Sequence, residues 1–341
     1  MRSTALTQQL CDFFESYLPQ VREYSRNTIL SYQDTFRLLM EYMESKKKIK
    51  PYSLDYKHLS DDVILDFLKW LRIERNCSAS TCNQRMTAIS SFFKFASRKN
   101  IAALKICNQL LDLPTKKAHH NLLSYFTVEE MQVLLQMPNP QRKLERRDLV
   151  LLSLLYDSGA RAQEICNLKT GDIRFSRPAT IRLFGKGDKT RIVPLTEKPA
   201  QMARQYISEL NHGQKADSNT LLFSSQTNKP ITPACVRYLL SKYVAKAKAT
   251  RPDLFQADAY SPHSIRHSKA VHMLEAGVDL IYIRDFLGHV SVQTTEIYAT
   301  VSSALVDKAL RERKIPEVTT GRLPMPVPDK SIPSFLKRQP R

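Results

Sequence analysis

The sequence has few cysteines, and they stand apart from one another. Its 341 residues hold six, and none of them forms a Cys-x-x-Cys pair: Cys11, Cys77, Cys82, Cys107, Cys166 and Cys235. Structural zinc sites and thioredoxin-like redox sites use such close pairs. The sequence therefore indicates neither kind of site, and we expect the thiols to be reduced and mostly buried.

Long apolar runs are also missing. The first residues, MRSTALTQQL, lack the apolar core of a signal peptide. The longest apolar stretch, LVLLSLLY at 149–156, is far shorter than the roughly 20 residues that a membrane-spanning helix needs. We therefore expect no membrane contact and a cytoplasmic protein.

Acidic residues are scarce relative to basic ones. Lys and Arg number 52 against 33 Asp and Glu, which gives a net charge of +19. The excess is spread along the chain, with 19 basic against 12 acidic residues in 1–120, 28 against 19 in 121–315 and 5 against 2 in 316–341. Such a distribution suits contact with a long polyanion at many phosphates. The alternative is that the charge serves general solubility.

A chain of this length exceeds what one hydrophobic core usually organises, so we predict two domains. Apolar positions at three- and four-residue spacing in residues 1–112 predict a bundle of about four helices. Ser60 is the expected N-cap of one helix, and Ser78 or Ser80 that of the next. Pro114 and the basic residues after it predict a linker over 113–125, and the Pro-rich basic residues 316–341 predict a disordered tail.

Several basic side chains fall on the predicted exposed ridges of this bundle. They are candidates for contacts to nucleic-acid phosphates, with a solvated helix surface as the alternative: Arg26, Lys46, Lys47, Arg85 and Lys94.

The pattern changes to mixed α and β over residues 126–315. Helical segments such as TVEEMQVLLQM precede three segments of strand character at 172–175, 180–186 and 190–195, and further helices follow. The turn from Gly185 to Lys189 joins the last two strands as a hairpin. The predicted fold is a two-domain protein, with an all-α bundle followed by a mixed α+β domain.

Two residues in this second domain are placed to meet a phosphate. Arg161 follows the break at Gly159 and opens a helix, and Glu164 lies three residues on, where it can orient the guanidinium. Lys186 sits in the tight hairpin, where the backbone fixes the reach of its ammonium and favours proton donation.

Further along, His263 and Arg266 are three residues apart and share one helix face. His289 follows Gly288, and Tyr298 lies nine positions later. Each of these residues taken alone fits packing as well as chemistry, because the chain holds 8 His and 14 Tyr.

The order and spacing of the whole set are more informative than any single residue. The segments SGARAQEI, FGKGDKTRIVPL, HSIRHS and LGHVSVQTTEIYA closely resemble the tyrosine recombinase (phage integrase) family. The resemblance covers about residues 126–315 and extends by architecture to the helical N-terminal domain, which in this family is a SAM-like, DNA-clamping core-binding domain.

The resemblance implies a role for each matching position. Arg161 and Arg266 would clamp the scissile phosphate, His263 would assist proton transfer, and His289 would be the second phosphate-contacting residue. Tyr298 would be the nucleophile.

Glu164 would brace the first arginine, and Lys186 would protonate the leaving 5′ oxygen. Lys189 and Arg191 lie on the same hairpin, so Lys189 stays an alternative for the acid, and both are candidate DNA contacts.

The resemblance further implies that the substrate is double-stranded DNA at specific sites. It also implies a homotetramer on DNA, in which residues 302–314 of each subunit dock on a neighbour, and related recombinases as further partners. The bacterial nucleoid would be its place of action.

Because the phosphotyrosine would conserve the bond energy, no cofactor is expected, and the sequence offers neither a P-loop nor a carboxylate cluster for a metal. The role favoured is integration or excision of a mobile element.

Three alternatives stay open. One is a chromosome dimer-resolving recombinase of the same family, and another is a type IB-like topoisomerase, which would rejoin the original strand. The third, from a different class, is a DNA-binding regulator with an idle active site.

Overall fold

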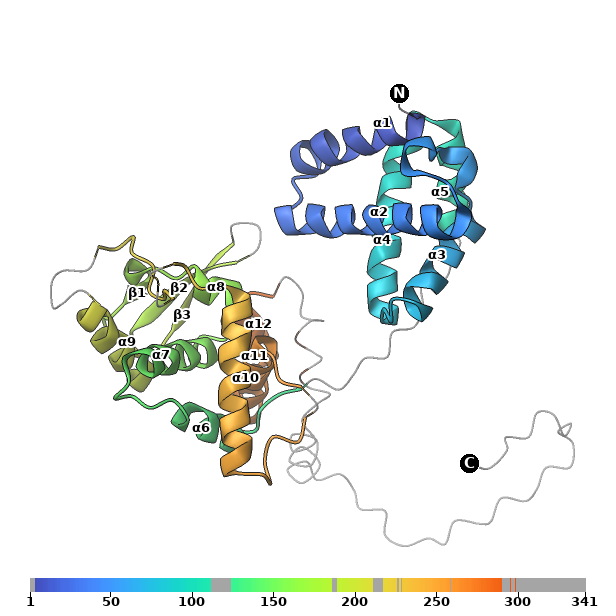
Figure 1. The fold of residues 1–341 in the computed structure, drawn as a ribbon. Coiled ribbons are helices and arrows are strands. Elements are labelled where there is room, and N and C mark those ends of the chain that lie inside the picture. The colour runs from blue at the N-terminus through green and yellow to red at the C-terminus, as the bar shows by residue number, and fades with distance from the viewer. Residues whose placement is uncertain are drawn as a thin grey trace, which may run out of the picture. The chain divides into compact units, whose positions relative to one another are not determined.

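The computed structural model describes residues 4–111, 124–185, 189–210, 217–225, 227, 229–257, 259–289, 295 and 298. The chain divides into two compact units, Met1–Asn121 and Leu122–Arg341 (Figure 1). Each unit has a hydrophobic core of its own. No helix in the described ranges has both the length and the apolar character that a bilayer span requires. The predicted tail at 316–341 lies outside these ranges, and so does most of the predicted linker.

The first unit is entirely helical. Its elements are α1 (Ala5–Asp12), a π-helix (Phe13–Val21), α2 (Arg26–Lys47), two 3-10 turns (Pro51–Ser53 and Tyr56–His58), α3 (Asp61–Ile73), α4 (Ala79–Ala96) and α5 (Ile101–Leu111). The described part of this unit thus has five α-helices where the sequence predicted about four. The difference arises because residues 5–21 form a segment of their own and Asn100 caps α5 separately from α4.

Side-chain caps fix where these helices begin. Ser60 accepts a hydrogen bond from the backbone N–H of Val63, and Ser78 accepts one from Thr81, which satisfies donors that the first helical turn leaves unpaired. The prediction for Ser60 is confirmed, and of the two candidates for the next helix the structure selects Ser78. The core between the helices is rich in aromatic rings, and the ring of Phe92 makes edge contacts with those of Phe13 and Phe36.

The second unit combines helices with a small sheet. It comprises α6 (Val128–Gln136), α7 (Lys143–Asp157), α8 (Ala162–Cys166), a 3-10 turn (Thr170–Asp172), β1 (Ile173–Arg174), β2 (Thr180–Phe184), β3 (Thr190–Pro194), α9 (Glu197–Leu210), α10 (Pro233–Thr250), α11 (Pro262–Glu275) and α12 (Leu280–Leu287). The two-domain fold class predicted from the sequence is confirmed. Figure 1 shows the strands on one side of this unit and α10, α11 and α12 gathered on the other.

The sheet is antiparallel in the order β1-β2-β3. Phe184 pairs with Thr190 at the hairpin end, and Ile181 pairs with Val193. Side chains alternate along β2, so Ile181 and Leu183 are buried while Arg182 and Phe184 face outward. The predicted hairpin between residues 180 and 195 is therefore present. It brings the start of β3 to the N-terminus of α8, where the candidate site begins.

Candidate functional site

Arg161 stands at the junction between α7 and α8. Gly159 ends α7 with a φ of +57°, a left-handed conformation that glycine adopts without steric cost. Arg161 then takes the N-cap position of α8. Its backbone N–H donates to Glu164 Oε2 at 2.8 Å, and its Nη1 donates to Glu164 Oε1 at 2.8 Å. The guanidinium is held in place and still 34% exposed.

A second guanidinium reaches the same carboxylate from β3. Arg191 donates from Nη1 and Nη2 to the two oxygens of Glu164, at 2.9 and 2.8 Å, and from Nε to the carbonyl of Phe286 at 3.1 Å. Burial by itself would raise the pKa of the Glu164 carboxyl. The hydrogen bonds and charges of Arg191 and Arg161 outweigh burial and hold that pKa below its usual value. Glu164 is therefore ionised at neutral pH.

A third guanidinium is fully buried. Arg266 projects from α11 and is 3% exposed, and it donates from Nη1 to the carbonyl of Gly159 and from Nη2 to that of Leu287, both at 2.7 Å. Burial and the nearby charges of Arg161 and Arg191 lower the pKa of Arg266 to about 9. Three guanidiniums thus gather around one paired carboxylate, so the site favours the approach of a further anion.

Three histidines surround this group of charges. His263 lies at the exposed start of α11, and His267 lies one turn further along, with the two rings stacked at 6.3 Å between centroids. His289 follows Gly288 at the end of α12, and its Nδ1 lies 3.0 Å from Thr295 Oγ1. Packing around the ring partly desolvates His263, and this effect, followed by the charge of Arg266, lowers its pKa. Burial and then the charge of Arg266 lower the pKa of His289 to about 4. Both rings are neutral at physiological pH.

Tyr298 lies in the middle of these residues. Its side chain is buried, with 2% exposed, and its hydroxyl lies 2.9 Å from Nδ1 of His267. The ring of His289 also stacks on that of Tyr298, with 6.2 Å between the ring centroids. Burial raises the pKa of the Tyr298 phenol, while the charges of Arg266 and Arg161 act to lower it. These two arginines are therefore near enough to favour a phenolate.

A cavity of about 380 Å³ opens beside this cluster. Its lining combines basic side chains with two glycines at sharp turns: Arg161, Gly185, Lys189, Thr190, Arg191, Asp285, Gly288 and His289. Such a basic hollow at a helix N-terminus suits a phosphate group. Among the described residues no group of His, Cys, Asp and Glu is arranged to hold a metal ion.

The comparisons with known proteins agree with this geometry. Residues 124–304 match the model of the phage integrase family, and residues 11–100 match that of the phage integrase N-terminal SAM-like domain. The chain is also 31% identical over 335 residues to a putative integrase/recombinase, y4rC, of Sinorhizobium fredii, and this match covers 98% of both chains.

The chain belongs to the phage integrase family. It is therefore a tyrosine recombinase, as the sequence motifs predicted. Other relatives include the tyrosine recombinase XerC of Lacticaseibacillus casei, 28% identical over 85% of this chain and 93% of the relative.

Solved structures of the family share the fold. The XerH site-specific recombinase bound to a palindromic difH substrate superposes with a TM-score of 0.68 at 22% identity, over 88% of this chain and 83% of that one. The Tn1549 transposon integrase in complex with transposon right-end DNA gives 0.68 at 16% identity, over 89% and 99%.

The structure brings together most of the residues that the family motifs singled out. Arg161 and Glu164 contact each other directly, and Arg266, His263, His289 and Tyr298 gather around them. Lys186 lies outside the described residues. Lys189 is exposed on the rim of the cavity.

One residue of the cluster was missed by reasoning from the sequence. His267 directly follows Arg266, and its contact with the Tyr298 hydroxyl spans 31 residues of sequence. The motif HSIRHS contains it, but helical spacing from His263 gives no sign that its ring turns toward a tyrosine so far along the chain. Only the folded structure brings the His267 ring beside the Tyr298 hydroxyl.

The basic candidates on the helical unit differ in their surroundings. Arg26 and Lys94 are exposed, and Lys46 and Lys47 form surface ion pairs with Glu74 at 2.7 Å and Asp66 at 3.2 Å. Such exposed pairs are weak, so both lysines can exchange partners for phosphates.

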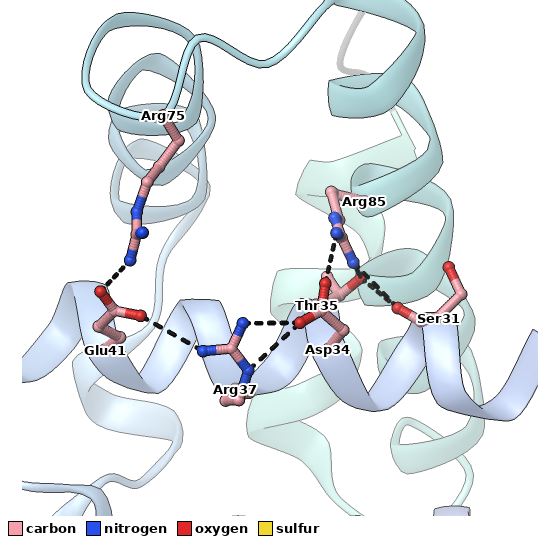
Figure 2. A network of polar contacts seen from close by, with 7 residues as sticks. All are labelled: Ser31, Asp34, Thr35, Arg37, Glu41, Arg75 and Arg85. Atoms are coloured by element: carbon pink, nitrogen blue, oxygen red, sulfur yellow. Dashed lines mark hydrogen bonds and ion pairs between the residues drawn. The ribbon is translucent and has the colours of Figure 1, made fainter. Parts of the chain in front are cut away.

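Arg85 is different, because it is tied into the network of Figure 2. Its Nη1 donates to the carbonyl of Ser31 and to Thr35 Oγ1, both at 3.0 Å, and its Nη2 pairs with Asp34. Its side chain is 16% exposed and ties α4 to α2. This arrangement favours a structural role over a phosphate contact.

Proposed function

We propose that this chain cleaves and rejoins double-stranded DNA at specific sites through a covalent 3′-phosphotyrosyl link to Tyr298, and that it integrates or excises a mobile genetic element. One observation carries the proposal. The Tyr298 hydroxyl lies among Arg161, Arg266 and a row of histidines, so the residue proposed as the nucleophile is close to those proposed to stabilise a phosphorane.

The reaction follows from the charges. A phenol has a reference pKa near 10 and is a weak nucleophile at neutral pH. Arg161 and Arg266 would bind the non-bridging oxygens of the scissile phosphate, with His263 and His289 completing the contacts. The Tyr298 oxygen would then bond to phosphorus as the bond to the 5′ oxygen breaks.

Departure of the 5′ oxygen requires a proton, and we assign this role to Lys186. Attack by the 5′ hydroxyl of a different strand on the phosphotyrosine would reverse the step and complete the exchange. Since the phosphotyrosine conserves the energy of the broken bond, the cycle would need no nucleotide and no metal.

Two arguments support a mobile-element role. The alignment with the putative integrase/recombinase y4rC spans 98% of this chain, whereas that with XerC of L. casei spans 85%. The chain also carries a Pro-rich basic segment at 316–341. Resolution of chromosome dimers is the alternative that the XerC relatives favour.

The partners follow from the reaction. Exchange between two DNA sites needs four strand cleavages, so we propose that four copies of this chain assemble on DNA. We propose that they act on the bacterial chromosome and that related recombinases can also take part as subunits. The predicted docking segment, 302–314, lies outside the described residues.

The test uses a labelled, nicked half-site from the ends of the element that encodes the protein, incubated without metal and resolved on a denaturing gel. Wild type should form a covalent adduct, and Tyr298→Phe should form none. Tyr282→Phe is the matched control, because Tyr282 is an exposed tyrosine on α12. Specific DNA binding without any adduct in wild type would instead identify a regulator with an idle site.

A strand-exchange assay addresses the remaining alternative. With two labelled sites of different length, a recombinase should produce chimeric strands. A topoisomerase would restore only the original strands.

A further inference from the structure

Among the residues that the structure describes, His267 contacts the reactive oxygen of Tyr298. The distance from its Nδ1 to the Tyr298 Oη is 2.9 Å, and the two ring centroids are 5.4 Å apart. No second partner of this hydroxyl is present among the described residues. A buried phenol donates its hydrogen where an acceptor is available, so Nδ1 of His267 accepts and its Nε2 carries the ring proton.

The other two histidines are differently engaged. His263 is exposed at the start of α11, one turn before His267. The ring of His289 stacks on Tyr298, but its Nδ1 lies against Thr295. A proton that leaves the Tyr298 oxygen therefore meets His267 first.

We propose, on the basis of the strand-cleavage function above, that His267 orients the Tyr298 hydroxyl and accepts its proton when the phosphodiester is attacked. The Oη–H bond breaks toward Nδ1 of His267 as the Oη–P bond forms. The P–O5′ bond breaks, and the 5′ oxygen takes a proton from Lys186. One proton thus arrives on the imidazole and one leaves the ammonium, so the step balances.

The surroundings of His267 link this transfer to DNA binding. The groups that face it are His263 and Arg266 on its own helix, with Tyr298 and His289 from outside it. Burial, then His263 and Arg266, lower the pKa of His267 to about 4, which keeps the ring neutral and able to accept. A phosphate bound to Arg266 adds negative charge beside the ring and raises its proton affinity. His267 therefore becomes an effective base only when the substrate is in place.

The variant that separates positioning from proton transfer is His267→Asn. An asparagine Oδ1 can occupy the place of Nδ1 and accept the hydrogen bond, but it does not take up a proton at neutral pH. His267→Leu removes both abilities. His272→Asn is the matched control on the same helix, because His272 bonds to Tyr156 and to the backbone of Phe126 away from the site.

The experiment measures single-turnover adduct formation by the full chain on two nicked half-sites. One carries a normal phosphodiester, and the other has sulfur in place of the bridging 5′ oxygen. Sulfur leaves without protonation, so this substrate should restore Lys186→Ala. His267→Asn should lose about 100-fold in rate, the scale of a general base. It should stay slow on the sulfur substrate and bind DNA as tightly as wild type.

Two results would overturn the proposal: a His267→Asn rate within about threefold of wild type, or its recovery on the sulfur substrate. Absence of adduct in wild type would instead remove the proposed function, and this assignment with it.

The main arm of a second measurement uses the wild-type chain alone. On the sulfur substrate the wild-type rate should fall on the acid side, because a protonated His267 cannot accept. The same fall should persist in His263→Asn. A flat acid side in wild type would also overturn the proposal.

Discussion

At the scale of single residues, the Glu164 carboxylate and its two arginines form a tightly coupled unit. Each oxygen of Glu164 accepts from Arg191, and Arg161 adds two further donors, one from its backbone and one from its side chain. The carboxylate is nearly inaccessible to water, with 3% of its side chain exposed. Removing its charge leaves buried cations without a counter-ion, which costs more than the loss of a surface pair.

Glu164→Gln should therefore destabilise the protein by about 3–5 kcal/mol at neutral pH, measured by urea unfolding. The pKa of Glu164 is lowered in the folded state. Its stabilising contribution is thus present above the unfolded value of about 4.3 and is lost as the pH falls through the folded pKa. Wild type should lose more stability than the variant on acidification below that value. Equal losses in both proteins would contradict the assignment.

The two hairpin residues proposed as DNA contacts should behave differently. Lys189 is exposed at the rim of the cavity, whereas the three guanidinium nitrogens of Arg191 all bond within the protein. Lys189→Ala should reduce the slope of log affinity against log salt by about one phosphate contact. Arg191→Ala should leave that slope unchanged and lower the melting temperature. A matching change of slope in both variants would show that Arg191 also binds phosphate.

At the scale of elements, the site depends on how α7, α11 and α12 meet. The carbonyl at the end of α7, that of Gly159, and the carbonyl at the end of α12, that of Leu287, both accept from Arg266 on α11. A Cβ at Gly159 would lie 2.8 Å from Leu287 Cδ2. The close approach of these helix ends thus requires a residue without a side chain.

Gly159→Ala should destabilise the protein by about 1–2 kcal/mol for its positive φ and by about 1–3 kcal/mol more for the forced packing. It should also slow cleavage, because the carbonyl that holds Arg266 would shift. Gly277→Ala is the control, since Gly277 has a φ of +86° but nothing within 4 Å of an added Cβ. It should carry the conformational cost alone and cleave at the wild-type rate. Similar behaviour of the two variants, measured by denaturant unfolding and adduct formation, would count against this packing argument.

At the scale of the whole molecule, each unit buries its own apolar side chains. The core of the first is centred on aromatic residues from α2, α3 and α4, and that of the second on α7, the sheet and α10. Both units are basic. Each unit thus combines a hydrophobic core of its own with a net positive charge, the features expected of an independently folding, DNA-binding domain.

Fragments 1–121 and 122–341 should accordingly each fold alone. Each should show cooperative thermal unfolding when the melt is monitored by circular dichroism. Each should bind DNA more weakly than the full chain, and the salt dependence of each should be shallower because fewer phosphates are contacted. A non-cooperative melt of fragment 1–121 would show that its core needs the rest of the chain.

Much of the fold could be predicted from the sequence because the signals are local. Helical spacing of apolar residues, the serine caps at Ser60 and Ser78 and the strand pattern around Gly185 each act within a few residues. The count of helices in the first unit was too low, since the short elements at 5–21 lack a long periodic pattern.

The sequence by itself determined the chemical inventory of this protein: its basic charge, its two domains and the ordered motifs that hold Arg161, Arg266 and Tyr298. Only the tertiary structure decided how that inventory is used. It pairs Arg191 with Glu164 and sets His267 against the Tyr298 hydroxyl. These contacts join residues 27 and 31 positions apart, and their partners are fixed by how helices and strands pack, which no local pattern encodes.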